Sequence, residues 1–122
     1  MWWKVLVVLL SVINVGFGLL GLVSPKRVGE LVDLSPLNPS AHGELRAVFG
    51  GLLVALGVIT VRALQQGDAG VLQAVGWGFL GLAVGRLISL ALDGVTTYTG
   101  LALVFEAAAG LLLMYAAGQL RS

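Results

Sequence analysis

The 122-residue sequence contains no cysteine, which excludes disulfide bonds, thiolate metal sites and cysteine-based catalysis or redox relays. Its single histidine, His42, is too few for a histidine-rich metal site. Charged residues make up only 11% of the chain, and seven basic against six acidic side chains leave a net charge of +1. Such a balanced charge gives no footprint for nucleic acid. We therefore expect no metal, no cofactor and no nucleic-acid partner.

Hydrophobic residues are abundant instead, at 58% of the chain, and the mean hydropathy is +1.01. A helix of about 20 mainly apolar residues crosses a hydrocarbon core of roughly 30 Å. Turn signals such as Ser24-Pro25 separate the apolar runs, and Asn38 is expected to cap a helix whose first residue is Pro39. Four membrane-spanning helices are predicted, over about residues 4–23, 40–63, 69–92 and 96–118.

These spans predict an all-α membrane protein with a single domain over residues 1–122. Short connections make an antiparallel four-helix transmembrane bundle the natural arrangement. A cleaved signal peptide is the alternative for the first run, but that run is longer than the usual stretch of about 7–15 residues and lacks an Ala-x-Ala exit. A soluble bundle would need helices with a broad charged face, and none of the four has one.

The connection over residues 24–38 contains a short amphipathic pattern. Val28, Leu31 and Val32 fall on one helical face and charged residues fall on the other. Ser24 can cap such a helix, and the proline after it suits the first turn. We predict a short interfacial helix between spans one and two, with an ordinary connector that has no lipid role as the alternative.

An even number of spans puts both termini on one side of the membrane. Lys4, Arg62 and Arg121 lie on that side, against Lys26, Arg27 and the partly embedded Arg46 on the other, so the positive-inside rule only barely tips the termini toward the cytoplasm. Aromatic residues fit the two interfaces, with Trp2, Trp3 and Tyr115 at one and Tyr98 at the other.

The chain contains 18 glycines, which would weaken soluble helices but allow membrane helices to approach closely. Gly81 and Gly85 form a small-xxx-small pair, and Ala47, Gly51 and Ala55 recur at intervals of four. This spacing predicts close helix packing, either within one bundle or between subunits. The glycines assigned to helix packing are Gly50, Gly51, Gly57, Gly81 and Gly85.

One polar residue stands out inside each apolar run: Asn14, Arg46, Arg86 or Glu106. At 1.5 Å per residue, all four lie roughly 10–15 Å below the surface that bears the long loop. An unpaired charge inside a membrane costs several kcal/mol, so we predict a buried polar layer in which Glu106 pairs with Arg86 or Arg46. The supporting polar residues around this layer are His42, Glu44, Ser89 and Asp93.

Three roles for this layer remain open. It is an ion-pair network that fixes the topology of the bundle, a cavity that binds an anionic or polar head group, or a proton or ion relay through Glu106. The sequence has no glycine-rich phosphate loop, no His-Glu-x-x-His and no Gly-x-Ser-x-Gly motif. We therefore assign no catalytic residue and do not expect an enzyme.

Two motifs resemble a known family. Residues 44–51, E-L-R-A-V-F-G-G, with Gly57 after them, resemble the start of the second helix in small bacterial membrane proteins catalogued as domain of unknown function 4345. Residues 85–94, G-R-L-I-S-L-A-L-D-G, resemble that family's second signature, and Glu106 matches its fourth-helix glutamate. The resemblance covers the chain from Asn14 to about Leu113. It implies that the polar positions of the family are Arg46, Arg86, Asp93 and Glu106.

The family is distantly similar to the DoxX-like four-helix membrane proteins, so the resemblance implies a multi-pass protein of the bacterial inner membrane. It supplies no activity. Two hypotheses follow for the function: a non-catalytic subunit or stabiliser of a larger membrane assembly, or a binding or transport protein. The second would use the polar layer for a lipid head group, a quinone or a small polar or anionic solute. The expected partners are membrane lipids, other membrane subunits or further copies of this chain.

Overall fold

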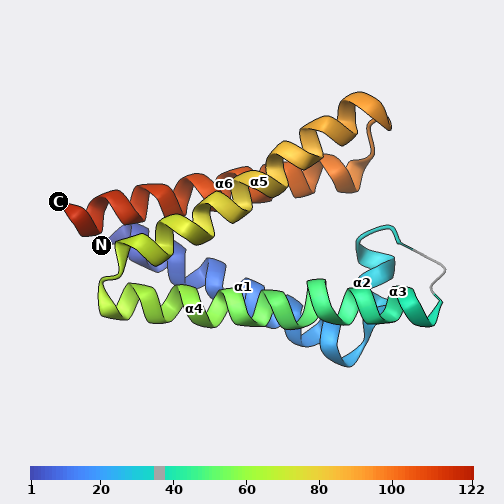
Figure 1. Ribbon diagram of the computed structural model, residues 1–122, viewed down its shortest axis with the longest axis horizontal. Helices are drawn as coiled ribbons and strands as arrows, with labels where there is room; N and C mark the ends of the chain where they lie inside the picture. Colours follow the sequence, from blue (N-terminus) through green and yellow to red (C-terminus); the bar gives the residue numbers. More distant parts are fainter. Residues whose placement is uncertain (35–37) are drawn as a thin grey trace. The chain divides into compact units, whose positions relative to one another are not determined.

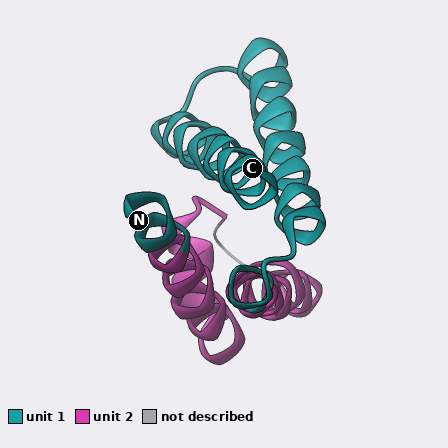
Figure 2. Ribbon diagram, turned by 90° about the vertical axis from the view of Figure 1, so that its left-hand side faces the viewer, with its two compact units in different colours: residues 1–7, 62–122 teal, residues 8–61 magenta. Residues whose placement is uncertain are grey.

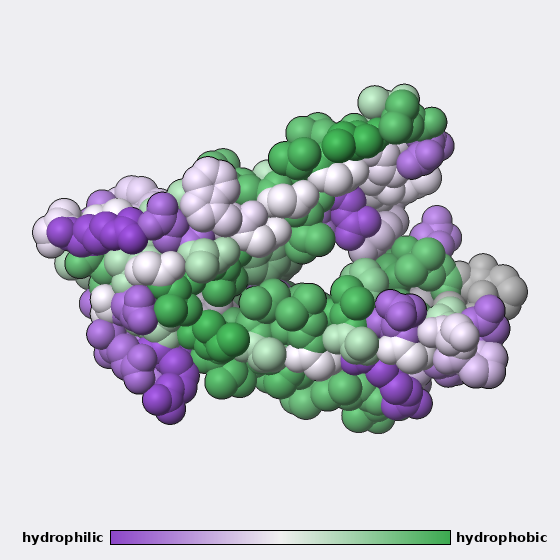
Figure 3. Space-filling model, viewed as in Figure 1, coloured by the Kyte–Doolittle hydropathy of each residue, from purple (hydrophilic) through white to green (hydrophobic). Residues whose placement is uncertain are grey.

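The computed structural model describes residues 1–34 and 38–122, and those residues form helices without a strand (Figure 1). Four helices are long and apolar enough to cross a membrane, which confirms the predicted all-helical, four-span fold class. Hydrophobic surface extends along these helices, and hydrophilic residues gather toward the helix ends (Figure 3). The four candidate spans are α1 (Trp2–Val23), the continuous helix Pro39–Gln66, α5 (Ala69–Leu92) and α6 (Thr97–Arg121).

The second span consists of three helical segments in succession, α3 (Pro39–Glu44), η1 (Leu45–Leu52) and α4 (Leu53–Gln66). Asn38 caps it as predicted, because its side-chain oxygen accepts a hydrogen bond from the Ala41 N–H at 2.8 Å. The middle segment, η1, is a π-helix, which the sequence did not predict. π-Helical turns are rare in proteins, and those that occur are often found at functional sites.

The predicted short helix after the first span is present as α2 (Pro25–Leu31), which packs against η1. Val28 and Val32 are buried as expected, but Leu31 is 59% exposed. The helix ends at Leu31 and the chain turns at Asp33, so Leu31 does not share the buried face. The Ser24 side chain makes no capping hydrogen bond. A position at the membrane surface stays a prediction, and residues 35–37 of the connection lie outside the described residues.

The chain divides into two compact units, residues 8–61 and residues 1–7 with 62–122 (Figure 2). Within residues 8–61, α1 runs antiparallel to the second span, and glycines bring the two backbones together. A Cβ added at Gly21 would lie 2.5 Å from the Phe49 carbonyl oxygen, and one added at Gly18 would lie 2.7 Å from that of Gly50. Gly57 lies equally close to the Ser11 backbone.

In the other unit, α5 and α6 form an antiparallel hairpin. Thr96 caps α6, since its hydroxyl oxygen accepts from the Thr99 N–H at 3.1 Å, and Gly94 takes the left-handed conformation in the turn, with φ of 98°. The helices approach most closely at Gly76 and Gly110, where an added Cβ would lie 3.1–3.2 Å from the opposite carbonyl oxygen. The large apolar side chains buried in this unit include Leu72, Phe79 and Leu113.

The five glycines assigned to helix packing fall into two groups. Gly50 and Gly57 are buried and lie against α1, as the prediction requires. A Cβ added at Gly51 would meet only its own helix, at 3.9 Å, and one added at Gly81 or Gly85 would meet no atom within 4 Å. The small-xxx-small pair of α5 is therefore not the face that packs on α6, because Gly76 occupies that face instead.

Candidate functional site

The turn between α5 and α6 brings two charged side chains to one level of the hairpin. Arg86 lies six residues before the end of α5, about 9 Å along the axis, and Glu106 lies nine residues into α6, about 13.5 Å. Side chains tilt toward the N-terminus of their own helix. Arg86 therefore tilts away from the turn and Glu106 toward it, and these opposite tilts close the offset.

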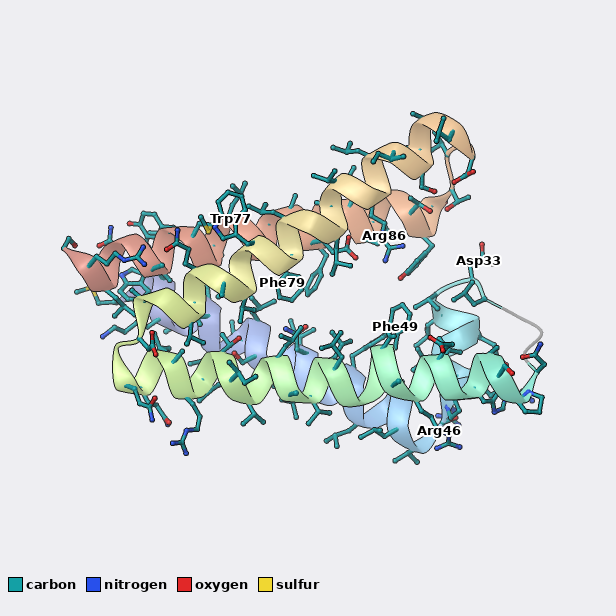
Figure 4. The ribbon with its side chains drawn as sticks, viewed as in Figure 1. Asp33, Arg46, Phe49, Trp77, Phe79 and Arg86 are labelled. Carbon is teal, nitrogen blue, oxygen red and sulfur yellow. The ribbon has the colours of Figure 1, made fainter. Side chains whose placement is uncertain are left out.

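Arg86 and Glu106 form a charge-assisted, two-pronged hydrogen-bonded pair. Nη2 of Arg86 donates to Oε1 of Glu106 at 3.0 Å, and Nε donates to both carboxylate oxygens at 3.2 Å. The Glu106 side chain is 8% exposed and the Arg86 side chain 25% exposed. Both oxygens of Glu106 accept from Arg86, so this carboxylate is committed to the pair rather than available as a general base. Arg86 is labelled in Figure 4.

Tyr98, in the first turn of α6, completes the cluster. Its hydroxyl accepts a hydrogen bond from Nη2 of Arg86 at 3.4 Å, and its ring centre lies 5.3 Å from the guanidinium carbon. An aromatic ring at this distance stabilises a cation through its quadrupole. The three residues together are called the Arg–Glu–Tyr cluster below: Arg86, Tyr98 and Glu106.

The two supporting residues on α5 form a separate contact. Ser89 donates from its hydroxyl to Oδ2 of Asp93 at 3.0 Å, and Asp93 is the C-terminal cap residue of α5. Asp93 was expected to support the polar layer, but it is exposed and accepts a hydrogen bond from Ser89 instead. Its carboxylate therefore closes the end of the helix rather than neutralising Arg86.

Arg46 lies away from the position that the sequence predicted for it. Its side chain is exposed, and Nη1 donates to the backbone carbonyl of Leu22 (Figure 4). Leu22 is the penultimate residue of α1, where carbonyls lack helical partners, so a cation stabilises this end. Leu22 lies eight residues beyond Asn14, about 12 Å along the axis. The guanidinium of Arg46 thus caps the end of α1 rather than lying at the level of Asn14.

The remaining supporting residues are near that helix start. His42 and Arg46 line a shallow open depression together with Asn38, Pro39 and Gly43. Glu44 is exposed, and no hydrogen bond or ion pair of its side chain is found among the described residues. Within residues 1–34 and 38–122, no group of three His, Asp or Glu side chains is placed to hold a metal ion.

Asn14 is the polar residue at the centre of α1. It is 3% exposed, and its amide nitrogen Nδ2 has no hydrogen-bond partner among the described residues. A buried amide without a partner costs about 1–3 kcal/mol. Asn14 and Arg46 belong to residues 8–61, whereas Arg86 and Glu106 belong to the other unit. Since Arg46 does not lie at the level of Asn14, only a layer shared by Asn14, Arg86 and Glu106 stays a prediction.

Sequence reasoning missed two partners. Tyr98 was expected at a membrane interface. The signal that could have linked it to Arg86 is that its long side chain begins just after the turn that follows the helix of Arg86. The Leu22 carbonyl could have been found by asking which helix ends lack a side-chain cap, since α1 ends in Val23 without a basic residue in its last turn.

Four apolar helices, two of them joined by a buried ion pair, define a multi-pass integral membrane protein. Its family follows from the family model for domain of unknown function DUF4345, which matches residues 2–117. Because the match covers nearly the whole chain, the protein belongs to that family, as the two motifs and Glu106 indicated. No curated protein and no solved structure matches the chain.

Proposed function

We propose that this protein is a non-catalytic membrane component that acts through its helix surfaces, as a subunit or stabiliser of a larger assembly. The observation that carries this proposal is that the glycines of α5 lie on two opposite faces, of which only one packs on α6. At about 100° per residue, Gly78, Gly81 and Gly85 lie on the side of the helix opposite Gly76. Gly76 contacts α6, whereas a Cβ added at any of the other three would meet no atom within 4 Å.

A membrane helix that exposes small residues at spacings of three and four offers a surface for another helix, because backbones can approach closely there. The charged side chains of the hairpin support the same role. Arg86 and Glu106 satisfy each other inside the α5–α6 pair, so neither charge requires an oppositely charged partner from outside the hairpin. We propose that the partner is a transmembrane helix of another protein, with a second copy of this chain as the other outcome of the test.

The test fills the open face of α5. Gly81→Leu is expected to remove the co-migrating partner when the protein is extracted from native membranes in mild detergent and sized on a native gel. Gly16→Leu is the matched control, because Gly16 is an equally open glycine within α1. Wild-type protein that migrates alone contradicts the proposal. A lower melting temperature of the isolated Gly81→Leu chain also contradicts it, since the face would then pack within the chain.

A second candidate function is binding or transport of a lipid head group, a quinone or a small polar or anionic solute. The observation that favours it is that a quarter of the Arg86 side chain is accessible, although Glu106 fixes it in place. An intramembrane ionisable group is by default a candidate functional site. Mass spectrometry of the purified protein tests this function: a small molecule that is retained by the wild type and lost in Tyr98→Phe supports it, and no retained molecule contradicts it.

We propose further that the chain is one four-span domain in a bacterial inner membrane, with both termini in the cytoplasm. The absence of cysteine makes single-cysteine labelling straightforward. Cysteines introduced at Trp2 and Gln119 are expected to react only from the cytoplasmic side with a reagent that cannot cross membranes. Reaction from opposite sides contradicts the four-span count, and reaction from the periplasmic side reverses the direction.

A further inference from the structure

The Arg–Glu–Tyr cluster has hydrogen-bond donors that it does not use. A guanidinium has five N–H groups, and in Arg86 those of Nε and Nη2 meet Glu106 and Tyr98. Across residues 1–34 and 38–122, Nη1 has no acceptor, and Tyr98 accepts from Arg86 without donating its own hydroxyl hydrogen. The cluster therefore presents two unused N–H groups and one unused O–H group, whereas the remaining lone pair of Oε2 belongs to a Glu106 side chain that is only 8% exposed. Its accessible hydrogen-bonding groups are mainly donors. It fits an oxygen atom that accepts hydrogen bonds.

The depth of the cluster in the membrane restricts which oxygen atoms can reach it. A helix of 24 residues is about 36 Å long, so α5 exceeds a hydrocarbon core of roughly 30 Å by about 3 Å at each end. The Cα of Arg86, about 9 Å from the end of α5, then lies about 6 Å below the boundary. Tyr98 begins in the first turn of α6, at the boundary itself. Arg86 tilts away from the turn, so its free N–H groups lie somewhat deeper than its Cα, and the Tyr98 hydroxyl reaches Nη2 of the same guanidinium from the boundary. An acceptor that meets these donors must lie below the phosphate level, as the ester carbonyl oxygens of lipids do.

Charge narrows the chemistry of the acceptor. The carboxylate of Glu106 lies 3.0 Å from the guanidinium and cancels its charge, so the cluster as a whole is neutral. A neutral cluster of donors gives an anion no net Coulomb attraction, whereas a neutral carbonyl oxygen gains the same hydrogen bonds at a lower cost of desolvation. A phosphate group would also have to leave the aqueous interface to reach this depth.

We infer that Arg86 and Tyr98 form a subsite for the ester carbonyl oxygen of a glycerophospholipid in the leaflet on the side of the α5–α6 turn. Nη1 of Arg86 and the hydroxyl of Tyr98 donate to that oxygen, and Glu106 holds the guanidinium in place. This inference rests on the second candidate function, lipid binding, and it specifies which group of the lipid is recognised.

The experiment compares two lipids that differ only in the carbonyl groups: dioleoyl phosphatidylcholine and its dialkyl ether analogue, which has the same head group. Native mass spectrometry of the detergent-purified protein gives the dissociation constant for each. One hydrogen bond corresponds to roughly a fivefold change in affinity, so the ester lipid is expected to bind the wild type about 5- to 25-fold more tightly than the ether lipid. Tyr98→Phe is expected to reduce this ratio about fivefold.

The control variant is Tyr115→Phe, which removes a hydroxyl from the exposed tyrosine that stacks on Trp2 at the other end of α6. It is expected to leave the ester-to-ether ratio unchanged. Equal affinities of the wild type for the two lipids overturn the inference, and this measurement needs no variant to fold. If Tyr98→Phe weakens the binding of both lipids equally, the carbonyl subsite is wrong but lipid binding stands. If neither lipid binds, the carbonyl subsite and the lipid-binding function are both wrong.

Discussion

The two helix pairs of this protein are stabilised by different means. Between α1 and the second span, four glycines of residues 8–61 allow the backbones to touch, and no ion pair is found between the described residues of that pair. Between α5 and α6, close approach is confined to Gly76 and Gly110, and a hydrogen-bonded Arg–Glu pair lies nearer the turn. Tight backbone packing leaves no room for a long side chain, and a buried guanidinium needs that room.

The same contrast extends to the polar groups. Glu106 has both of its oxygens occupied by Arg86, but the buried amide nitrogen of Asn14 has no partner among the described residues. The α5–α6 pair therefore adds an ion pair to its apolar packing, whereas the α1 pair has no ion pair among the described residues, relies more on close backbone contact and tolerates an unsatisfied amide. If this distinction is correct, charge substitutions and steric substitutions should separate the two pairs.

The largest expected effect is the loss of the carboxylate. Glu106→Leu leaves Arg86 in a low-dielectric interior without its partner and is expected to lower the free energy of unfolding by about 3 kcal/mol. Reversible unfolding in mixed micelles measures this change. Glu44→Leu is the control, because Glu44 is exposed, and it should change stability by less than about 0.5 kcal/mol. Similar losses of unfolding free energy in both variants would mean that the Arg86–Glu106 pair does not contribute specifically to stability.

A steric substitution should act on the other pair. Gly21→Ala places a Cβ 2.5 Å from the Phe49 carbonyl oxygen, so the two backbones must separate, at an expected cost of about 2 kcal/mol. Gly16→Ala, on the same helix with no atom within 4 Å, should be neutral or slightly stabilising, because alanine favours the helix. Thermal unfolding of the two variants in one detergent compares them. A neutral Gly21→Ala would show that α1 does not pack through its glycines.

The smallest expected effect concerns the end of α1. Arg46→Met keeps the length of the side chain but removes the donor to the Leu22 carbonyl, and it should cost about 1 kcal/mol. Arg62→Met is the control, because Arg62 is exposed and has no partner of this kind in the described residues. Amide hydrogen exchange should accelerate in the last turn of α1 for Arg46→Met only. Unchanged exchange there would contradict the capping role.

Sequence reasoning predicted the spans because about 20 apolar residues in succession have one physical solution in a membrane. It gave Glu106 either Arg86 or Arg46 as a partner because each buried charge needs one, and the structure shows the pair with Arg86. It misplaced Arg46, because a long side chain near a helix start can reach the end of a neighbouring helix, and residue counting along one helix does not include that reach. Glycine spacing did not indicate which face of α5 packs on α6, because small residues occur on both sides of that helix. It also did not indicate the π-helical segment η1.

A double-mutant cycle on Arg86 and Glu106 tests most directly whether the α5–α6 pair is held by its ion pair. The free energy of unfolding is measured for the wild type, Arg86→Met, Glu106→Leu and the double variant. The account predicts that the double variant is more stable than Glu106→Leu alone, with a coupling energy of about 1–3 kcal/mol, because replacing both partners leaves no charge stranded. Strictly additive losses would mean that the two residues act independently, and would contradict the account.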